Sequence, residues 1–411
     1  MSRTDHVLIV GAGHAGGRVA QHLLEFGHTG RITLVGEETH APYERPALSK
    51  ELLTGEREAA ELTLAPAEFW TQDRIERRVA RVTAIDGTTR TARLSTGEVL
   101  AFDRLVVATG GGARRLQLPG ADLPGVHVLR TIDDSLALRA ALAARPQRLV
   151  VIGGGVIGME AAAAARGLGH EVTVLEAGPR IMARCVPAAG SAWLAQLHRS
   201  QGVRLEEGVR LQQLQRDGEQ LRVDYLDAQG AAVSLPADHV LVAVGISPAT
   251  DFLAASGVSL QDGVLTDEYG RSVSADWCYA VGDVANSHNP VYGRGLRLET
   301  WRNAENQARA VAAALVGEPE AYAEVPWMWT DQFGHNIQVV GLCSPHDVVI
   351  TRAELEAEGG LLLWMRDGRV AGGMLVDCGR ERKQLEALVR RAAQVSGSAL
   401  ADASLPLKAL A

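Results

Sequence analysis

The glycine pattern G-x-G-x-x-G occurs twice in this chain, and it limits the fold more than any other feature. The first copy consists of Gly11, Gly13 and Gly16, and the second of Gly153, Gly155 and Gly158. In both copies a strand-like run, at 6–10 and at 149–152, precedes the glycines, and a helix-like segment follows them. This order of strand, glycine turn and helix predicts two dinucleotide-binding βαβ units.

Each glycine has its own physical task in such a unit. The first permits the tight turn, the second lets the backbone approach a pyrophosphate, and the third lets helix and strand pack closely. The pyrophosphate lies at the helix N-terminus, where free N–H groups and the helix dipole favour an anion. Glu37 and Glu176 occupy equivalent positions at the end of the next strand. Because Glu176 can accept hydrogen bonds from both ribose hydroxyls and would repel a 2′-phosphate, it predicts NAD rather than NADP.

Two modules imply two bound dinucleotides, and FAD with NAD(P)H is a common pairing in one enzyme. A small β-meander with its closing strand is also duplicated, ending at 105–110 and at 240–245. The sequence therefore predicts an α/β fold with two Rossmann-like, three-layer ββα dinucleotide-binding domains and an α+β C-terminal domain. We expect one discontinuous domain at 1–112 and 246–320, a second at 113–245, and the C-terminal domain at 321–411.

Local patterns place the remaining elements. We expect strands at 31–35, 78–85, 172–175 and 277–283, and helices at 17–26, 133–144, 156–165, 303–315 and 380–395. In the C-terminal part, strands are expected at 337–341, 347–350, 361–366 and 369–376.

Composition excludes several classes of protein. The net charge of −8 argues against a general binder of nucleic acid or anionic membranes. The most apolar stretch, at 149–165, is too short and too rich in glycine to cross a membrane. The four cysteines form no C-x-x-C pair, which indicates structural thiols in a reducing compartment rather than a zinc site or a dithiol relay. We therefore expect a soluble cytoplasmic protein without a metal site.

Three polar residues near the expected turns have open interpretations. Arg45 lies in a proline-stiffened loop at 42–50, and its guanidinium suits a pyrophosphate; the alternative is a solvated surface loop. Asp283 ends an apolar strand, where a carboxylate suits a sugar-type hydroxyl. His14 lies inside the first glycine loop, and we expect it to face solvent, with a polar contact near the phosphates as the alternative.

Several longer motifs, spread over essentially the whole chain, carry a family resemblance. They are GAGHAG (11–16), LVGEE…PYERPALSK (34–50), LVVATG (105–110), VLRTIDD (128–134), VVIGGGVIGME (150–160), VAVGISP (242–248), YAVGDVA (279–285), RLETWRNAENQ (297–307) and PWMWTDQ (326–332). With these motifs the chain resembles the flavoprotein NADH:ferredoxin reductases that serve oxygenases, within the glutathione-reductase-like superfamily. The likeness is to the reductases of aromatic-ring dioxygenase systems such as biphenyl dioxygenase, and to the putidaredoxin reductase type.

The resemblance implies cofactor contacts at matching positions. For FAD these are Gly11, Gly13, Ala15, Gly16, Glu37, Arg45, Lys50, Val82, Thr109, Gly110, Arg130, Asp283 and Trp301. For NAD they are Gly153, Gly155, Val156, Ile157, Gly158, Glu160, Glu176, Gly245 and Glu299. The discontinuous domain would thus bind FAD, and the domain at 113–245 would bind NAD.

The resemblance also implies the reaction, which is hydride transfer from NADH to FAD followed by single-electron transfer to a [2Fe-2S] ferredoxin, with a Rieske type favoured. Lys50 would lie near the flavin N5, where its cation stabilises negative charge on the reduced ring. Glu160 would pair with Lys50, and Trp329 would lie on the side facing the ferredoxin. The alternatives are an ordinary helix-start acid for Glu160 and core aromatics for Trp327 and Trp329.

Other functions of flavoproteins with this fold would require sequence features that can be looked for in this chain. Disulfide reductases, NADH peroxidases and NADH oxidases need a reactive cysteine near the flavin, but Ser49 and Lys50 occupy that helix start and no cysteine precedes Cys185. A reductase for rubredoxin or another one-electron acceptor stays open. A flavoprotein binder of the apoptosis-inducing-factor type should show long basic clusters, and this chain has only short ones, such as 77–81. We expect a monomer or a weak homodimer.

Overall fold

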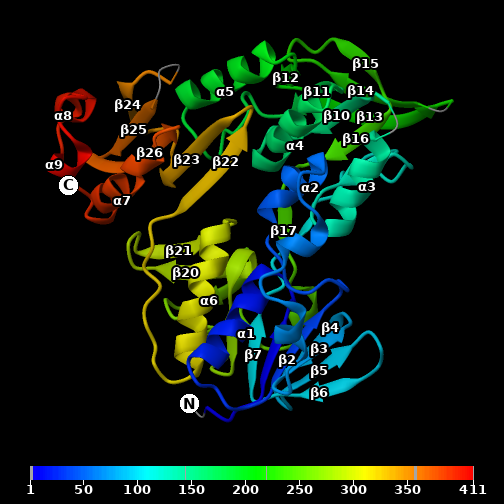
Figure 1. Ribbon diagram of the computed structural model, residues 1–411, viewed down its shortest axis with the longest axis vertical. Helices are drawn as coiled ribbons and strands as arrows, with labels where there is room; N and C mark the ends of the chain where they lie inside the picture. Colours follow the sequence, from blue (N-terminus) through cyan, green and yellow to red (C-terminus); the bar gives the residue numbers. More distant parts are fainter. Residues whose placement is uncertain (1–2, 144, 219, 356–358, 411) are drawn as a thin grey trace. The chain divides into compact units, whose positions relative to one another are not determined.

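A computed structural model describes residues 3–143, 145–218, 220–355 and 359–410, and its chain divides into two units (Figure 1). Unit 1 comprises Met1–Arg45, Ala59–Gly112 and Ser247–Glu324, and unit 2 comprises Pro46–Glu58, Ala113–Ile246 and Val325–Ala411. The short strands β8 (Gly111–Ala113) and β17 (Ile246–Pro248) lie where the chain passes from one unit to the other.

A buried parallel sheet with the strand order β19-β7-β1-β2-β3 forms the centre of unit 1. Its strands are β1 (Val7–Val10), β2 (Ile32–Gly36), β3 (Ile75–Val79), β7 (Arg104–Val107) and β19 (Cys278–Ala280). All side chains of β1 are buried, as expected for a strand that is covered on both faces. Helices α1 (His14–Glu25) and α6 (Trp301–Leu315) lie side by side and share one apolar core with β1 (Figure 1).

Smaller sheets complete the described part of unit 1. One is an antiparallel meander of β4 (Val82–Asp86), β5 (Thr91–Leu94) and β6 (Val99–Ala101). Another contains β18 (Val264–Thr266), β20 (Ala285–Asn289) and β21 (Arg294–Arg297). The short 3-10 helix η5 (Gly282–Val284) follows β19 and carries Asp283 at the carboxyl end of the parallel sheet.

Unit 2 repeats the same plan around a parallel sheet with the order β12-β11-β10-β16-β9. Its strands are β9 (Val126–Val128), β10 (Arg148–Ile152), β11 (Glu171–Glu176), β12 (Arg204–Glu207) and β16 (His239–Val242), and its helices are α3 (Ile132–Leu142), α4 (Val156–Gly167) and α5 (Ala188–Ser200). A meander of β13 (Arg210–Asp217), β14 (Gln220–Leu226) and β15 (Ala232–Ala237) precedes β16. The expected duplication of parallel sheet, glycine turn, helix and meander is therefore confirmed.

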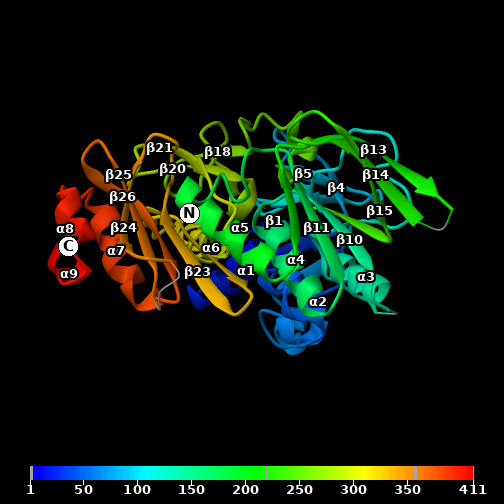
Figure 2. The ribbon, with the colours of Figure 1, turned by 90° about the horizontal axis from the view of Figure 1, so that it is seen from above.

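Unit 2 also contains an antiparallel sheet with the order β22-β23-β26-β25-β24. Its strands are β22 (Trp327–Gln332), β23 (His335–Gly341), β24 (Val348–Ala353), β25 (Leu361–Arg366) and β26 (Arg369–Val376), and the last helices are α7 (Arg382–Arg390), α8 (Gly397–Ala401) and α9 (Leu407–Leu410). α7 packs on β23 and β26 (Figure 2). Helix α4 contacts both β11 and β22, so this antiparallel sheet reaches the second glycine loop's helix.

Some elements differ from the expected ones. The strand expected at 78–85 is two strands, because β3 continues the parallel sheet whereas β4 begins the meander. α6 begins at Trp301 rather than at residue 303, because the Thr300 hydroxyl accepts a hydrogen bond from the Asn303 N–H and caps the helix. The helix expected at 380–395 is α7, which covers only Arg382–Arg390, and two shorter helices follow it. α5 and β22 had not been expected as a helix and a strand. Ala144, the last residue of the helix expected at 133–144, lies outside the described residues.

Among the described residues, no helix has both the length and the apolar composition that a membrane crossing needs.

Candidate functional site

The glycine loop of unit 1 makes a tight turn in which only glycine fits at two positions. Gly11 has φ +111°, and a Cβ built there would lie 2.2 Å from the carbonyl oxygen of Ala108. A Cβ on Gly16 would lie 1.9 Å from the carbonyl oxygen of Gly11. Gly13 precedes the first residue of α1, and because it has no side chain, it cannot cap the helix. The first N–H groups of α1 are thus available to an anion.

Arg45 lies at this loop, because a Cβ on Gly13 would be 3.3 Å from its Nη2 atom. The guanidinium donates to Glu38 Oε1 at 2.8 Å and to the Tyr43 hydroxyl at 3.0 Å, and the hydroxyl donates to Glu38 Oε2 at 2.5 Å. Burial acts to lower the pKa of Arg45, but Tyr43 and Glu38 outweigh burial and the pKa is raised. The loop therefore faces a permanently charged cation that is held in place, which suits a pyrophosphate.

The other expected FAD residues of unit 1 lie around the carboxyl ends of its strands. Glu37 directly follows β2 and is exposed, with Arg81 Nε at 3.7 Å. Thr109 donates from its hydroxyl to the Ala249 carbonyl at 2.8 Å, and Gly110 has φ +60°. Val82 is buried at the start of β4. Glu299, which was expected at the NAD site, also belongs to unit 1 and accepts a hydrogen bond from Arg297 at 2.7 Å.

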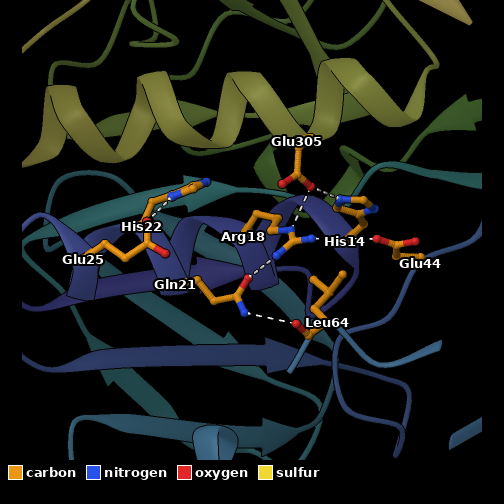
Figure 3. Close-up of polar contacts among 8 residues, drawn as sticks. All are labelled: His14, Arg18, Gln21, His22, Glu25, Glu44, Leu64 and Glu305. Carbon is orange, nitrogen blue, oxygen red and sulfur yellow. Dashed lines mark hydrogen bonds and ion pairs between the residues drawn. The ribbon is translucent and has the colours of Figure 1, made fainter. Parts of the chain in front are cut away.

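His14 is buried rather than facing solvent, which corrects our expectation, since only 7% of the residue is exposed. Figure 3 shows His14 and Arg18 converging on the carboxylate of Glu305 in α6. His14 Nε2 and Arg18 Nε both lie 2.7 Å from Glu305 Oε2, and the imidazole meets the Trp301 ring edge-on at 5.5 Å. His14 therefore lies between α1 and α6, where the Glu305 carboxylate provides the hydrogen-bond partner for its Nε2 atom.

Glu305 is held as an anion in this contact. Burial acts to raise the pKa of Glu305, but the hydrogen bond from His14 and the charge of Arg18 outweigh burial and lower the pKa. The sequence contained no signal for this contact, because His14 and Glu305 are 291 positions apart.

The glycine loop of unit 2 repeats the geometry of the first. Gly153 also has φ +111°, and a Cβ on it would lie 2.4 Å from the Ala243 carbonyl oxygen. A Cβ on Gly158 would lie 2.0 Å from the carbonyl oxygen of Gly153. Gly155 precedes α4 and has no atoms within 4 Å of an added Cβ. The helix begins with Val156 and the exposed Ile157, so its N-terminal N–H groups are accessible to an anion.

Glu176 at the end of β11 is tied to the same loop. Its Oε2 accepts the Gly154 N–H at 2.6 Å, and its Oε1 accepts the Gly178 N–H at 2.6 Å. Each carboxylate oxygen keeps a second lone pair for a hydroxyl donor. Gly245, with φ +98°, follows β16, which belongs to the same sheet as β11. Arg130 precedes Thr131, the N-cap of α3, and its backbone N–H donates to the Asp134 carboxylate.

Unit 2 contains both Lys50 and Glu160, and their charged groups lie close together. Lys50 Nζ lies 4.0 Å from Glu160 Oε1 and 2.9 Å from Asp331 Oδ2. The Ser49 hydroxyl donates to Glu160 Oε2 at 2.5 Å, and the Thr330 hydroxyl donates to Oε1 at 2.7 Å. Glu160 is only 4% exposed, so it is not an ordinary solvated helix-start acid.

Burial has opposite consequences for the two partners. It acts to lower the pKa of Lys50, but Glu160 and Asp331 outweigh it, and the pKa is raised. Burial raises the pKa of Glu160, and Lys50, Ser49 and Thr330 act against this rise. The lysine therefore carries a fixed positive charge at the start of α2 (Glu51–Thr54), beside a carboxylate that depends on its hydrogen bonds.

Two tryptophans extend this cluster in β22. Trp329 stacks on Trp327 with ring centroids 5.2 Å apart and an interplanar angle of 20°. Lys50 Nζ lies 5.5 Å from the centre of the Trp329 ring, and Arg382 lies 4.7 Å from that of Trp327. Both rings are half-buried and lie between cations, which distinguishes them from ordinary core aromatics.

Burial affects the thiol pKa of three of the four cysteines. Burial raises the pKa of Cys343, of Cys278 and of Cys378, the last to about 11. No disulfide joins the cysteines within the described ranges, and no three His, Cys, Asp or Glu side chains group there as a metal site would require.

Comparison with known proteins identifies the class first. Residues 5–308 match the family model described as pyridine nucleotide-disulphide oxidoreductase, and residues 327–411 match a model described as reductase C-terminal. The chain belongs to the pyridine nucleotide-disulphide oxidoreductase family, whose ferredoxin reductases contain FAD and use NAD(H). Each glycine loop leads into a helix without a side-chain cap, and such helix N-termini fit the pyrophosphates of these two cofactors.

Full-length relatives define the branch. The chain is 37% identical over 402 residues to the benzene 1,2-dioxygenase system ferredoxin–NAD(+) reductase subunit of Pseudomonas putida, covering 97% of this chain and 96% of that protein. It is 36% identical over 410 residues to the biphenyl dioxygenase system ferredoxin–NAD(+) reductase component of Paraburkholderia xenovorans, covering 99% and 98%.

Solved structures agree with these relatives. The ferredoxin reductase for the CYP199A2 system from Rhodopseudomonas palustris matches with a TM-score of 0.93 at 35% identity, covering 98% of this chain and 99% of that chain. Putidaredoxin reductase, in its covalent complex with putidaredoxin, matches with a TM-score of 0.92 at 34% identity, covering 99% and 98%. Within its family the chain is thus a member of the ferredoxin–NAD(+) reductase branch, and the resemblance stated from the motifs is confirmed.

Proposed function

We propose that this chain passes electrons from NADH, through FAD, singly to a [2Fe-2S] ferredoxin that feeds an aromatic-ring dioxygenase or a P450. A Rieske-type ferredoxin is the proposed partner, because relatives of the same length serve dioxygenase systems. The observation that carries the proposal is the pair of Lys50 and Glu160 near the start of α4, at the second glycine loop. A position that would hold a reactive cysteine in disulfide reductases is occupied by Ser49.

The proposal assigns each cofactor to one glycine loop. Residues 1–112 and 246–320 would hold FAD, through the first loop, Arg45, Glu37 and Asp283. Residues 113–245 would hold NADH, through the second loop and Glu176, and residues 321–411 would form the side that meets the ferredoxin. When bound, the flavin accepts a hydride and releases its electrons one at a time.

The protein's own residues supply position and charge. Helix α4 offers N–H groups to the NADH pyrophosphate, and Glu176 accepts from the ribose hydroxyls and opposes a 2′-phosphate. Lys50 supplies a fixed cation where negative charge develops. Glu160 keeps Lys50 in place, and Trp329 lines the side from which electrons leave. We further propose that the protein works in the cytoplasm as a monomer or weak homodimer.

Reduction assays with purified protein test the function. NADH should bleach the flavin absorbance under anaerobic conditions, and cytochrome c should be reduced only when a [2Fe-2S] ferredoxin is added. Rieske-type and plant-type ferredoxins and rubredoxin are compared by kcat/KM. Flavin bleaching without ferredoxin-dependent turnover would contradict the electron-transfer role, and faster turnover with rubredoxin would replace the proposed partner.

A further inference from the structure

A chain of buried hydrogen bonds leads from Glu160 into the interior of unit 2. The Thr330 hydroxyl contacts Glu160 Oε1 at 2.7 Å, and Gln332 Nε2 donates to Thr330 Oγ1 at 2.9 Å. Gln332 Oε1 lies 2.7 Å from His198 Nε2 in α5. Thr330, Gln332 and His198 are at most 1% exposed, so water does not compete for these bonds.

With Glu160 ionised, the chemistry of the groups determines the direction of every hydrogen bond in this series. An ionised carboxylate only accepts, so the single hydroxyl proton of Thr330 must point to Glu160. Thr330 Oγ1 therefore accepts from the Gln332 amide N–H, which leaves the amide carbonyl facing His198. His198 must then carry its proton on Nε2. All donors point toward Glu160, and hydrogen bonds aligned in this way polarise and strengthen one another.

His198 is suited to end the chain. Burial lowers the pKa of its imidazole to about 4, with the Gln332 carbonyl acting in the opposite direction. Its Nδ1 atom is buried and, among the described residues, has no hydrogen-bond partner. The ring meets Phe333 edge-on at 4.8 Å. The imidazole is therefore neutral at pH 7 and held as the Nε2–H tautomer.

The charges that face Glu160 come from two elements packed against α4. Lys50 approaches from the segment between η1 (Pro46–Ser49) and α2, and Asp331 approaches from β22. Lys50 favours the ionised carboxylate, whereas burial and Asp331 disfavour it. Because burial and the nearby charges act in opposite directions on the pKa of Glu160, the hydrogen bonds from the Ser49 and Thr330 hydroxyls add directly to the stability of the ionised carboxylate.

We propose that Thr330, Gln332 and His198 are positioning residues that keep Glu160 ionised and its carboxylate oriented toward Lys50. The inference rests on the proposed function, in which the Lys50–Glu160 pair assists hydride transfer. Packing alone does not account for the three residues, because apolar side chains of similar size would fill the same core without the cost of buried polar groups.

The decisive experiment uses the FAD-loaded enzyme and one hydroxyl. Thr330→Val removes the donor to Glu160 and keeps the shape of the side chain, and Thr330→Ser restores the hydroxyl. Thr33→Val is the matched control, because Thr33 is also fully buried and also bonds one histidine, His6, at 2.9 Å. Infrared spectra recorded against pH follow the protonated carboxyl band, which Glu160→Gln assigns. Stopped-flow traces give the limiting rate of flavin reduction by NADH.

In Thr330→Val, we expect the protonated carboxyl band of Glu160 to persist to a higher pH than in the wild type. The limiting rate of flavin reduction at pH 7 should fall about tenfold. Thr330→Ser should recover most of both, and Thr33→Val should match the wild type. Gln332→Met should shift the band in the same direction. A Thr330→Val enzyme with an unshifted band and an unchanged pH profile would overturn the proposal.

Failure of this inference can be distinguished from failure of the proposed function. If the wild-type enzyme is reduced by NADH and turns over with ferredoxin while Thr330→Val behaves like Thr33→Val, only the positioning role is wrong. If NADH fails to reduce the wild-type flavin, the proposed function is wrong, but the infrared shift still tests the hydrogen-bond chain. Thermal melting of each variant separates a local effect from loss of folding, and a rate loss that follows melting without a band shift contradicts the proposal.

Discussion

Lys50 is the residue on which the proposed hydride transfer depends most. Its ammonium group is held by Glu160 and Asp331 and keeps its charge, because these carboxylates outweigh the effect of burial on its pKa. A fixed cation stabilises developing negative charge more than water does, since it needs no reorganisation. The prediction at this scale therefore concerns the charge rather than the shape of the side chain.

Lys50→Met should lower the limiting rate of flavin reduction by about tenfold or more, because it removes the cation but keeps an unbranched side chain of similar length. Stopped-flow absorbance gives the rate. Lys408→Met, at an exposed position near the C-terminus, is the control and should be unchanged. A Lys50→Met rate within about twofold of the wild type would remove Lys50 from the mechanism.

His198 should make the folded protein sensitive to acid. The pKa of His198 in the folded state is about 4, which is below the ordinary value of 6.5. Between these two pH values, His198 is protonated in the unfolded chain but neutral in the folded protein. Stability is then lost as the pH falls from about 6.5 toward 4, by about 2 kcal/mol between pH 7 and pH 5. His198→Gln keeps an N–H donor without titrating. Denaturant melts at pH 7 and pH 5 should show a smaller loss for this variant than for wild type, and equal losses would contradict the assignment.

At the scale of the element, β11 connects cofactor choice to loop structure. Glu176 at its end accepts hydrogen bonds from the N–H groups of both Gly154 and Gly178, so the carboxylate that we propose for the ribose contact is already oriented before a ligand binds. Such orientation reduces the entropy that binding must overcome.

Glu176→Ala should raise the KM for NADH by about tenfold and reduce the preference for NADH over NADPH, because the hydrogen-bond acceptor and the charge that repels a 2′-phosphate are both lost. Steady-state kinetics with the two nucleotides measure this. Glu171→Ala, an exposed change at the start of the same strand, is the control. Unchanged discrimination in Glu176→Ala would show that another residue selects the nucleotide.

Elements with strong local patterns were predictable from sequence. β1 and β10 are short buried runs directly before glycines, and the loops after them need the positive φ that only Gly11 and Gly153 adopt easily. α5 was missed because its sequence, AAGSAWLAQLHRS, begins with small residues, has no acidic residue in its first turn and has no side-chain cap. β22 was missed because its half-buried tryptophans lack the alternation of a surface strand.

The glycine loops and the Lys50–Glu160 pair were predictable, whereas the surrounding contacts were not. Ser49 and Glu160 are 111 positions apart, Glu160 and Thr330 are 170 apart, and His198 and Gln332 are 134 apart. No periodicity links positions so distant, because the antiparallel sheet and α4 meet only through tertiary packing. The contact between His14 and Glu305 was missed for the same reason.

For the whole molecule, we propose that electrons enter at the NADH site and leave on a different side, past Trp329. In β22, Trp329 stacks on Trp327, and its ring lies beside the ammonium group of Lys50. The proposed path of electrons to the ferredoxin passes this ring. Trp329→Ala should therefore lower the rate of ferredoxin reduction about tenfold while the rate with ferricyanide, a small acceptor, falls less. Parallel assays with the two acceptors supply the control within each preparation. Equal losses with both acceptors would refute a role at the exit.

The most direct test of the central claim is a single anaerobic experiment with wild-type protein, NADH and a Rieske-type [2Fe-2S] ferredoxin. We expect NADH to bleach the flavin rapidly and two molecules of added ferredoxin to be reduced per NADH, because one hydride carries two electrons. Flavin that stays oxidised with NADH, or reduced flavin that leaves the ferredoxin oxidised, would contradict the account.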